Sequence, residues 1–287
     1  MMVHPLTDHD PLVQEIVNAS GNKIPIFVEG EPKKGEEIEY GRWCGNSPVR
    51  FFGRDGKESL FKDLEFMEGR INQIFAIVDR DLALPEEIEK TLDSKYDGRL
   101  YYLPCYDLEC FYVDPSAVWH CIKQSHFRDL DSFDPQWRDI DGIRSQIAKI
   151  AEEAIPQTAG NIVLRQARKE GFKDFNSIDP FLSEEEVIDQ LKICFSDRQD
   201  WVKEKFSGSI NYVRSFFPDK YFKIISGKKF LVKALFKRLQ EKNIKILQDT
   251  FFNISSYYLN ENPPQDFIDL IEKTILPRAR KLAMNSN

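Results

Sequence analysis

Short apolar runs that end in carboxylates constrain the fold of this chain more than any other feature. Three such runs are residues 24–28 (IPIFV), 73–78 (QIFAIV) and 99–103 (RLYYL). Each has the length of a buried strand, and helical patterns separate them. A further strand is predicted at 49–52 (VRFF). Strands that alternate with helices predict an α/β fold, in which a parallel sheet carries helices on both faces. Ligands of such sheets bind beyond the carboxyl ends of the strands.

The alternation of strands and helices stops near residue 117. The next hundred residues have mainly helical signals, including a capping box formed by Ser183 and Glu186. A strand-like stretch, YFKII at 221–225, then precedes Ser226-Gly227 and another helical pattern. We therefore predict that 221–225 joins the first sheet and that the helical region is an insertion. The predicted organisation is a first α/β part at 1–117, a helical insertion at 118–217, a returning strand and helix at 218–245, and a helical tail at 246–287.

The acids that follow the predicted strands form the candidate site. They are Glu29, then Asp79 and Asp81, then Asp107 and Glu109. The carboxyl ends of parallel strands share one edge, so these side chains are expected to converge there. Converging carboxylates repel one another unless a cation neutralises them. Mg²⁺ suits such a group because it prefers oxygen ligands. Each acid taken alone also fits a plain role as a helix N-cap or loop residue.

The order of these motifs resembles that of the Toprim superfamily. The motifs are VEGE at 28–31, VDRD at 78–81 and DLE at 107–109. The superfamily includes topoisomerases, primases and OLD-type nucleases. More narrowly, the pattern is similar to that of bacterial standalone Toprim-like proteins, among them the effector of PARIS-type anti-phage systems. The resemblance covers about residues 24–115 and the segment around Ser226-Gly227-Lys228. It implies a Toprim-like α/β domain.

The resemblance also implies roles for single residues. Glu29 would bind metal or shuttle a proton, and Asp79 and Asp81 would hold Mg²⁺ or Mn²⁺. Glu31 and Glu109 would complete a second metal site, and Asp107 is a further implied metal ligand. Lys228 or Lys229 would stabilise phosphate charge. The implied activity is metal-dependent hydrolysis of nucleic-acid phosphodiester bonds, in DNA or RNA, transfer RNA included. The implied biological role is that of a defence effector restrained by an ABC-like ATPase partner.

The charge of the chain is unevenly distributed. The net charge is −7, yet residues 201–245 hold twelve Lys or Arg against three Asp or Glu, a local +9 that leaves −16 elsewhere. This asymmetry fits a nucleic-acid surface on an acidic protein, and it equally fits a solvated basic face. Lys229, Lys233 and Lys237 repeat every four residues and would line one helix face. Both a phosphate-binding face and a merely solvated one fit this spacing. Aromatic residues between the lysines fit a stacking platform or an ordinary core.

Other features of the sequence narrow the functional class. The five scattered cysteines are typical of reduced thiols in the cytoplasm. No apolar stretch reaches the roughly 18 residues that span a membrane. The first eleven residues lack the pattern of a secretory signal. No phosphate-binding G-x-x-x-x-G-K-[ST] loop occurs, so any ATP hydrolysis is expected in a partner. The Cys and His spacings match no zinc motif.

Two other functions also fit the sequence, and homo-oligomerisation stays open. One is a non-catalytic regulatory or nucleic-acid-binding module that keeps the fold. The other is a small-molecule phosphohydrolase, whose acids could look identical.

Overall fold

The computed structural model describes residues 10–94, 96, 98–128, 130–172 and 177–285, which form two compact units. The first unit comprises Met1–Pro104 and Ser256–Asn287, and the second comprises Cys105–Ser255. Most of the opening segment, for which we expect no secretory signal, lies outside the described residues. None of the helices within the described ranges is long and apolar enough to cross a membrane.

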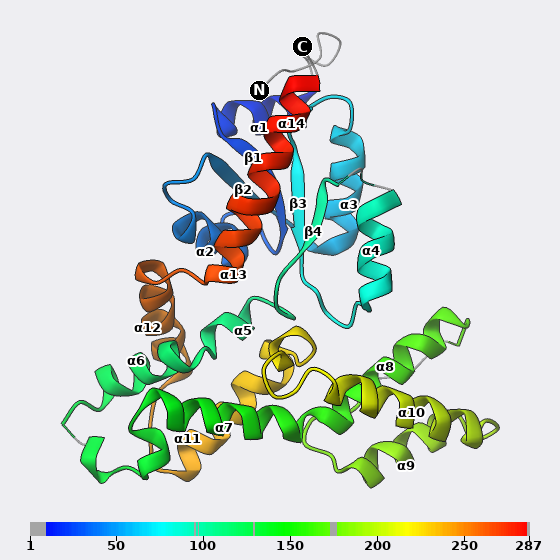
Figure 1. The fold of residues 1–287 in the computed structure, drawn as a ribbon, viewed down its shortest axis with the longest axis vertical. Helices are drawn as coiled ribbons and strands as arrows, with labels where there is room; N and C mark the ends of the chain where they lie inside the picture. The colour runs from blue at the N-terminus through cyan, green and yellow to red at the C-terminus, as the bar shows by residue number, and fades with distance from the viewer. Residues whose placement is uncertain (1–9, 95, 97, 129, 173–176, 286–287) are drawn as a thin grey trace. The chain divides into compact units, whose positions relative to one another are not determined.

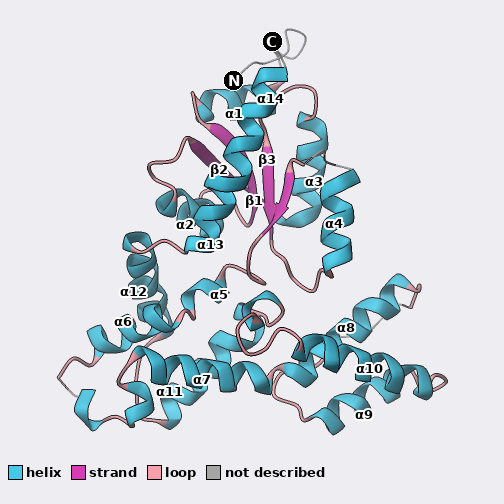
Figure 2. Ribbon diagram, viewed as in Figure 1, coloured by secondary structure: helices cyan, strands magenta, loops and turns pink. Residues whose placement is uncertain are grey.

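The first unit is built on a four-stranded, all-parallel sheet with the strand order β2-β1-β3-β4 (Figure 2). The strands are β1 (Ile24–Glu29), β2 (Val49–Arg54), β3 (Phe75–Val78) and β4 (Leu100–Tyr102). The helical elements are α1 (Pro11–Ser20), α2 (Gly35–Trp43), α3 (Gly56–Met67), α4 (Pro85–Ser94), α13 (Gln265–Asp269), η6 (Leu270–Ile275) and α14 (Leu276–Asn285). The predicted α/β class and the four strands predicted between residues 24 and 103 are confirmed.

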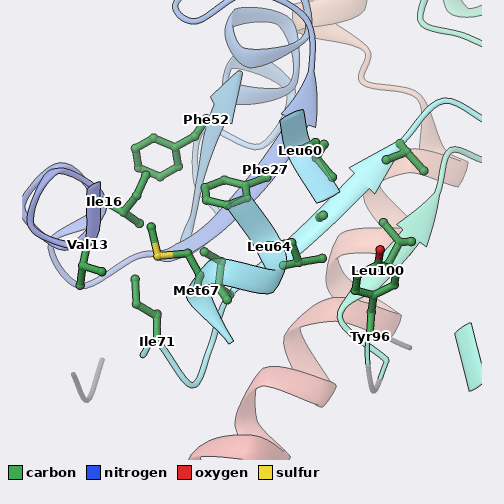
Figure 3. Close-up of a cluster of buried hydrophobic side chains, with 13 residues drawn as sticks. Val13, Ile16, Phe27, Phe52, Leu60, Leu64, Met67, Ile71, Tyr96 and Leu100 are labelled. Carbon is green, nitrogen blue, oxygen red and sulfur yellow. The ribbon is translucent and has the colours of Figure 1, made fainter. Parts of the chain in front are cut away.

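One face of the sheet packs against α1 and α3 (Figure 3). Phe27 of β1 and Phe52 of β2 point to this face, and their rings meet edge to face with centroids 6.5 Å apart. Leu60 and Leu64 of α3 recur at helical spacing and are buried against the strands. Burial of such side chains stabilises the unit by about 1.5–3 kcal/mol each.

The opposite face of the sheet is covered by α2 and by the end of the chain. Phe51 of β2 lies 5.8 Å from Tyr40 of α2 and 6.2 Å from Phe267 of α13, measured between ring centroids. Gln73, just before β3, donates from Nε2 to the Ala279 carbonyl of α14 at 2.9 Å. Since both faces are covered, the central strands β1 and β3 are continuous apolar runs rather than alternating ones.

The second unit is helical. Its elements are α5 (Glu109–Tyr112), α6 (Pro115–Ser125), η2 (Leu130–Ser132), η3 (Pro135–Trp137), α7 (Ile140–Glu153), α8 (Ile155–Lys169), α9 (Glu184–Cys194), α10 (Gln199–Arg214), η4 (Tyr221–Lys223), η5 (Gly227–Leu231) and α11 (Val232–Glu241); α12 (Gln248–Glu261) crosses the boundary between the units (Figure 1). The predicted capping box at α9 is confirmed, because Ser183 and Glu186 exchange both bonds at 2.7 and 3.3 Å.

The predicted strand at 221–225 is wrong. Tyr221–Lys223 form a 3-10 turn, and this segment belongs to the helical unit rather than to the sheet. Tyr221, Ile224 and Ile225 are buried, a spacing of three and four residues that suits a helical turn. The Phe222 carbonyl accepts from Tyr106 N–H at 2.7 Å instead of joining a ladder. The sheet unit is nevertheless discontinuous, since residues 256–287 of the tail complete it.

Candidate active site

The carboxyl edge of the sheet brings the first two acidic motifs together. Glu29 is the last residue of β1, and Asp79 directly follows β3, the neighbouring strand. The backbone N–H of Asp79 donates to Glu29 Oε1 at 2.8 Å. This bond spans fifty residues of sequence and fixes the two motifs side by side. The expected convergence of Glu29 with the VDRD segment is therefore present in the structure.

A cation that the sequence analysis missed lies at the centre of this group. Lys57 Nζ is 2.8 Å from the Asp79 carbonyl oxygen and 3.5 Å from Glu29 Oε1, and it forms an ion pair with Asp81 Oδ2. Lys57 is in the first turn of α3, directly beyond the carboxyl end of β2. The same rule that selected Glu29 and Asp79, a polar residue after a parallel strand, could have selected Lys57.

The pKa values of this cluster reflect burial and mutual charge. Burial raises the pKa of the Glu29 carboxyl above its ordinary value, although Lys57 and the Asp79 N–H oppose the rise. Burial by itself lowers the pKa of Lys57, but the fields of Asp81 and Glu29 outweigh it and raise the net value. Lys57 is thus a charged ammonium at neutral pH, and it contacts three oxygens.

Two residues after the strand ends, Gly30 and Asp81, have a positive φ at the carboxyl edge of the sheet. Gly30, within VEGE, has a φ of +100°, a conformation that favours glycine, and a Cβ there would overlap the Glu36 carboxylate. Asp81 has a φ of +48°, the left-handed region that aspartate tolerates better than most residues. This conformation presents Asp81 to Lys57 while its side chain stays 53% exposed.

The oxygens around Lys57 fit a metal ion in type. Glu29 Oε1, the Asp79 carbonyl and Asp81 Oδ2 are hard ligands of the kind that Mg²⁺ and Mn²⁺ bind. The ammonium of Lys57 occupies the place of the cation between them. Within the described ranges, no three His, Cys, Asp or Glu side chains form a group that could hold a metal. A metal would therefore use these oxygens only after Lys57 moves aside.

Glu31 is placed differently from Glu29. It is exposed and forms an ion pair with Lys34 at 2.5 Å, and this hydrogen bond lowers the pKa of the Glu31 carboxyl. The contacts described for Glu31 therefore tie it to the loop that leads into α2. No contact in the described residues joins it to Asp79 or Asp81.

Asp107 and Glu109 belong to the second unit, where Asp107 anchors a helix start. Asp107 is 5% exposed. Its Oδ2 accepts from Ser226 Oγ at 2.8 Å, and its Oδ1 accepts from Gly227 N–H at 3.0 Å. Lys228 N–H donates to Oδ2 at 3.2 Å. Burial raises the pKa of Asp107, and these donors limit the rise. A Cβ on Gly227 would lie 2.4 Å from the Cys110 nitrogen, which explains why glycine follows Ser226.

Lys228 and Glu109 form a long ion pair in the same unit. Lys228 Nζ is 3.9 Å from Glu109 Oε1, and the Lys228 side chain is 76% exposed. The DLE motif and Ser226-Gly227-Lys228 are thus neighbours, although 120 residues separate Asp107 from Gly227. The resemblance selected both segments, and the structure assigns them to one local cluster.

The basic stretch is less positive in the folded chain than its sequence indicates. Several of its cations pair with acids from outside the stretch: Lys203 with Asp200, Arg214 with Glu184, Arg238 with Glu153 and Lys242 with Asp134. Lys229 of η5 and Lys233 and Lys237 of α11 are exposed. Lys237 lies over the Phe181 ring at 5.3 Å.

Comparison with known proteins adds no assignment: no protein-family model and no curated protein matches the chain.

Proposed function

We propose that this protein is a metal-dependent nuclease whose centre is formed by Glu29, Asp79 and Asp81, with Lys57 as a fourth member. One observation carries the proposal. Three oxygens from two neighbouring strand ends surround a single positive charge at the carboxyl edge of a parallel sheet. Such an edge is where ligands bind in open α/β sheets.

The composition of the cluster suits phosphoryl chemistry. A bound Mg²⁺ or Mn²⁺ would polarise a phosphodiester and activate a water molecule. Glu29 is suited to accept a proton, because burial raises the pKa of its carboxyl toward neutrality. The described contacts of Glu29 go to Oε1, which leaves Oε2 to take that proton.

Lys57 has a separate role in this proposal. Its ammonium balances Glu29 and Asp81 before metal binds. Once it moves aside, it remains close enough to neutralise charge on a phosphate. The metal-ligand roles that the motif resemblance implies for Glu31, Asp107 and Glu109, and the phosphate-stabilising role that it implies for Lys228, stay predictions.

The biological role and the partner rest on the motifs. VEGE, VDRD and DLE resemble those of standalone Toprim-like effectors. On that basis the role is anti-phage defence in the cytoplasm, under the control of an ABC-like ATPase.

The test is cleavage of labelled DNA and RNA by purified protein with Mn²⁺, Mg²⁺ or EDTA. We expect cleavage only with metal. Asp81→Asn removes a ligand charge and should lower the rate by at least about a hundredfold, the scale of losing one group that stabilises charge in the transition state. Glu58→Gln, an exposed change on α3, is the matched control and should leave the rate unchanged.

Two results would contradict the proposal. If no metal supports cleavage, even with the ATPase partner present, the chain is a binding or regulatory module. If free nucleotides are hydrolysed and polynucleotides are not, it is a small-molecule phosphohydrolase. Equal rates for Asp81→Asn and the parent would exclude this cluster as the centre.

A further inference from the structure

A basic pocket of about 370 Å³ lies on the first unit, between α2 and the outer strand β2. Four of the residues that line it are cations: Lys23, Lys33, Arg42 and Arg50. They come from four separate places, the segment before β1, the loop after β1, helix α2 and strand β2. Glu37 is the acid in the lining.

The charges of this pocket do not cancel. The Glu37 carboxylate accepts hydrogen bonds from the backbone N–H of Lys33 at 2.9 Å and of Gly53 at 2.8 Å. Its described hydrogen bonds therefore go to backbone groups and not to the cationic side chains of the pocket. Arg42 pairs with Glu39 at 3.2 Å. In the described part of the chain, no ion pair involves Lys23, Lys33 or Arg50. The pocket therefore keeps a surplus of positive charge in a chain whose net charge is −7.

The position of the cations suits an elongated ligand. Lys23 immediately precedes β1, and Lys33 lies four positions after Glu29, the last residue of β1. A six-residue strand is about 20 Å long. The lining therefore draws on both ends of the strand. The Lys33 end belongs to the carboxyl edge, where Glu29 contacts Lys57 and Asp79.

We infer that this pocket binds the phosphate backbone of a nucleic-acid strand and leads it to the carboxyl edge. The inference rests on the proposed nuclease function. Backbone phosphates are bound by spread-out Lys and Arg residues without regard to base sequence, whereas a single phosphate group needs donors that converge. The second cluster of lysines, on η5 and α11, is in the other unit and is a separate candidate surface.

Gly41 allows a clean test. It is an exposed α2 residue in the pocket lining, and a Cβ built there meets no atom within 4 Å. Gly41→Glu therefore adds a negative charge to the pocket, and Gly41→Gln adds the same bulk without charge. Gly41→Lys adds a positive charge. Glycine is a poor helix former, so all three replacements suit the backbone of α2.

The measurement is the Kd of a fluorescently labelled single-stranded oligonucleotide, as DNA and as RNA, in EDTA so that no cleavage occurs. We expect Gly41→Glu to bind roughly tenfold more weakly than Gly41→Gln, the scale of one added charge near a phosphate at moderate ionic strength. Gly41→Lys should bind the oligonucleotide more tightly than Gly41→Gln does. The slope of log K against log salt should become shallower by about 0.7 for each phosphate of the single strand that the variant no longer neutralises.

Equal Kd values for Gly41→Glu, Gly41→Gln and Gly41→Lys would overturn the inference. If Gly41→Glu fails to fold by circular dichroism, Arg50→Glu against Arg50→Gln, at an exposed lining residue, carries the same comparison. If only the Lys229/Lys233/Lys237→Glu variant loses affinity, the second unit holds the strand and the pocket does not. Cleavage is measured separately with Mn²⁺ on the parent. Binding without cleavage would therefore contradict the nuclease proposal and leave the pocket assignment standing.

Discussion

At the scale of single residues, Lys57 is the group whose position most needs an explanation. A lysine in the first turn of a helix is disfavoured by the helix dipole. Here the ion pairs with Asp81 and Glu29 hold its ammonium, and although burial lowers the pKa of Lys57, these two charges raise the net value. Removing this charge should have two linked effects, one on the protein without metal and one on metal binding.

Lys57→Met is expected to lower the melting temperature in EDTA, because Glu29 and Asp81 lose their cation. Mn²⁺ should also raise the melting temperature of Lys57→Met more than that of the parent. In the variant the metal no longer competes with an ammonium, and its binding stabilises the folded state by mass action. Thermal unfolding with and without Mn²⁺ measures both effects. Lys62→Met, in an exposed pair on the same helix, is the control. If Mn²⁺ raises the melting temperature of Lys57→Met no more than that of the parent, Lys57 does not compete with the metal.

Asp107 is a second residue whose role the structure redefines. Its buried carboxylate accepts from Ser226, Gly227 and Lys228. Asp107→Asn would turn one oxygen into a donor that faces other donors. We expect the free energy of unfolding to fall by about 1–3 kcal/mol, the cost of leaving buried polar groups unpaired. Urea denaturation measures it, and Asp200→Asn, at a fully exposed carboxylate, should change it little.

The pH dependence of the Asp107 effect has a defined sign. Because burial raises the folded-state pKa of Asp107, the folded protein binds this proton more readily than the unfolded chain does. The contribution of Asp107 to stability is therefore greatest below its ordinary pKa of 3.8 and declines as the pH rises through the raised folded value. The free energy of unfolding of the parent minus that of Asp107→Asn should therefore decrease as the pH rises from below 3.8 through the raised folded pKa. If this free-energy difference stays constant over that pH range, the pKa of Asp107 is not raised.

At the scale of elements, the C-terminal tail is part of the sheet unit. Phe267 of α13 is fully buried, with ring centroids 4.5 Å from Tyr40 and 5.5 Å from Trp43. Phe267→Ala should lower the free energy of unfolding by about 3–5 kcal/mol, as is typical of a truncated core aromatic.

The control for this prediction comes from the same segment of the chain. Tyr257 is 62% exposed, so Tyr257→Ala should change the stability by less than about 0.5 kcal/mol. Urea denaturation of both variants makes the comparison. Similar small effects for the two would mean that the tail does not cover the sheet.

The elements also explain which sequence patterns were informative. The strands β1 and β3 were predictable because each is a continuous apolar run, as expected for strands buried on both faces. YFKII at 221–225 has a similar composition and yet forms a helical turn. A short apolar run does not by itself distinguish a strand from a buried helical segment. Here the Phe222 carbonyl accepts from the Tyr106 N–H and the neighbouring Ser226 donates to Asp107, both contacts within the helical unit.

At the scale of the whole molecule, thiol reactivity tests the burial pattern of both units at once. Four cysteines are buried and Cys194 is exposed. Burial raises the pKa of Cys44 to about 12 and of Cys121 to about 11, and it raises that of Cys110 as well. We expect one thiol to react rapidly with Ellman's reagent in the native protein and five after denaturation. Cys194→Ser should abolish the rapid phase. Several rapid thiols would contradict the packing of both units.

The sequence by itself determined the α/β class, four strands and the meeting of VEGE with VDRD. These follow from local apolar patterns and from the shared carboxyl edge of parallel strands. Only the tertiary structure brought Lys57 among the acids, assigned Asp107 to a helix anchor and used residues 256–287 to cover the sheet. These features depend on contacts between segments far apart in the chain, including one across 119 residues. The local spacing of apolar residues indicates which face of a segment is buried, but it does not indicate which distant segment packs against that face.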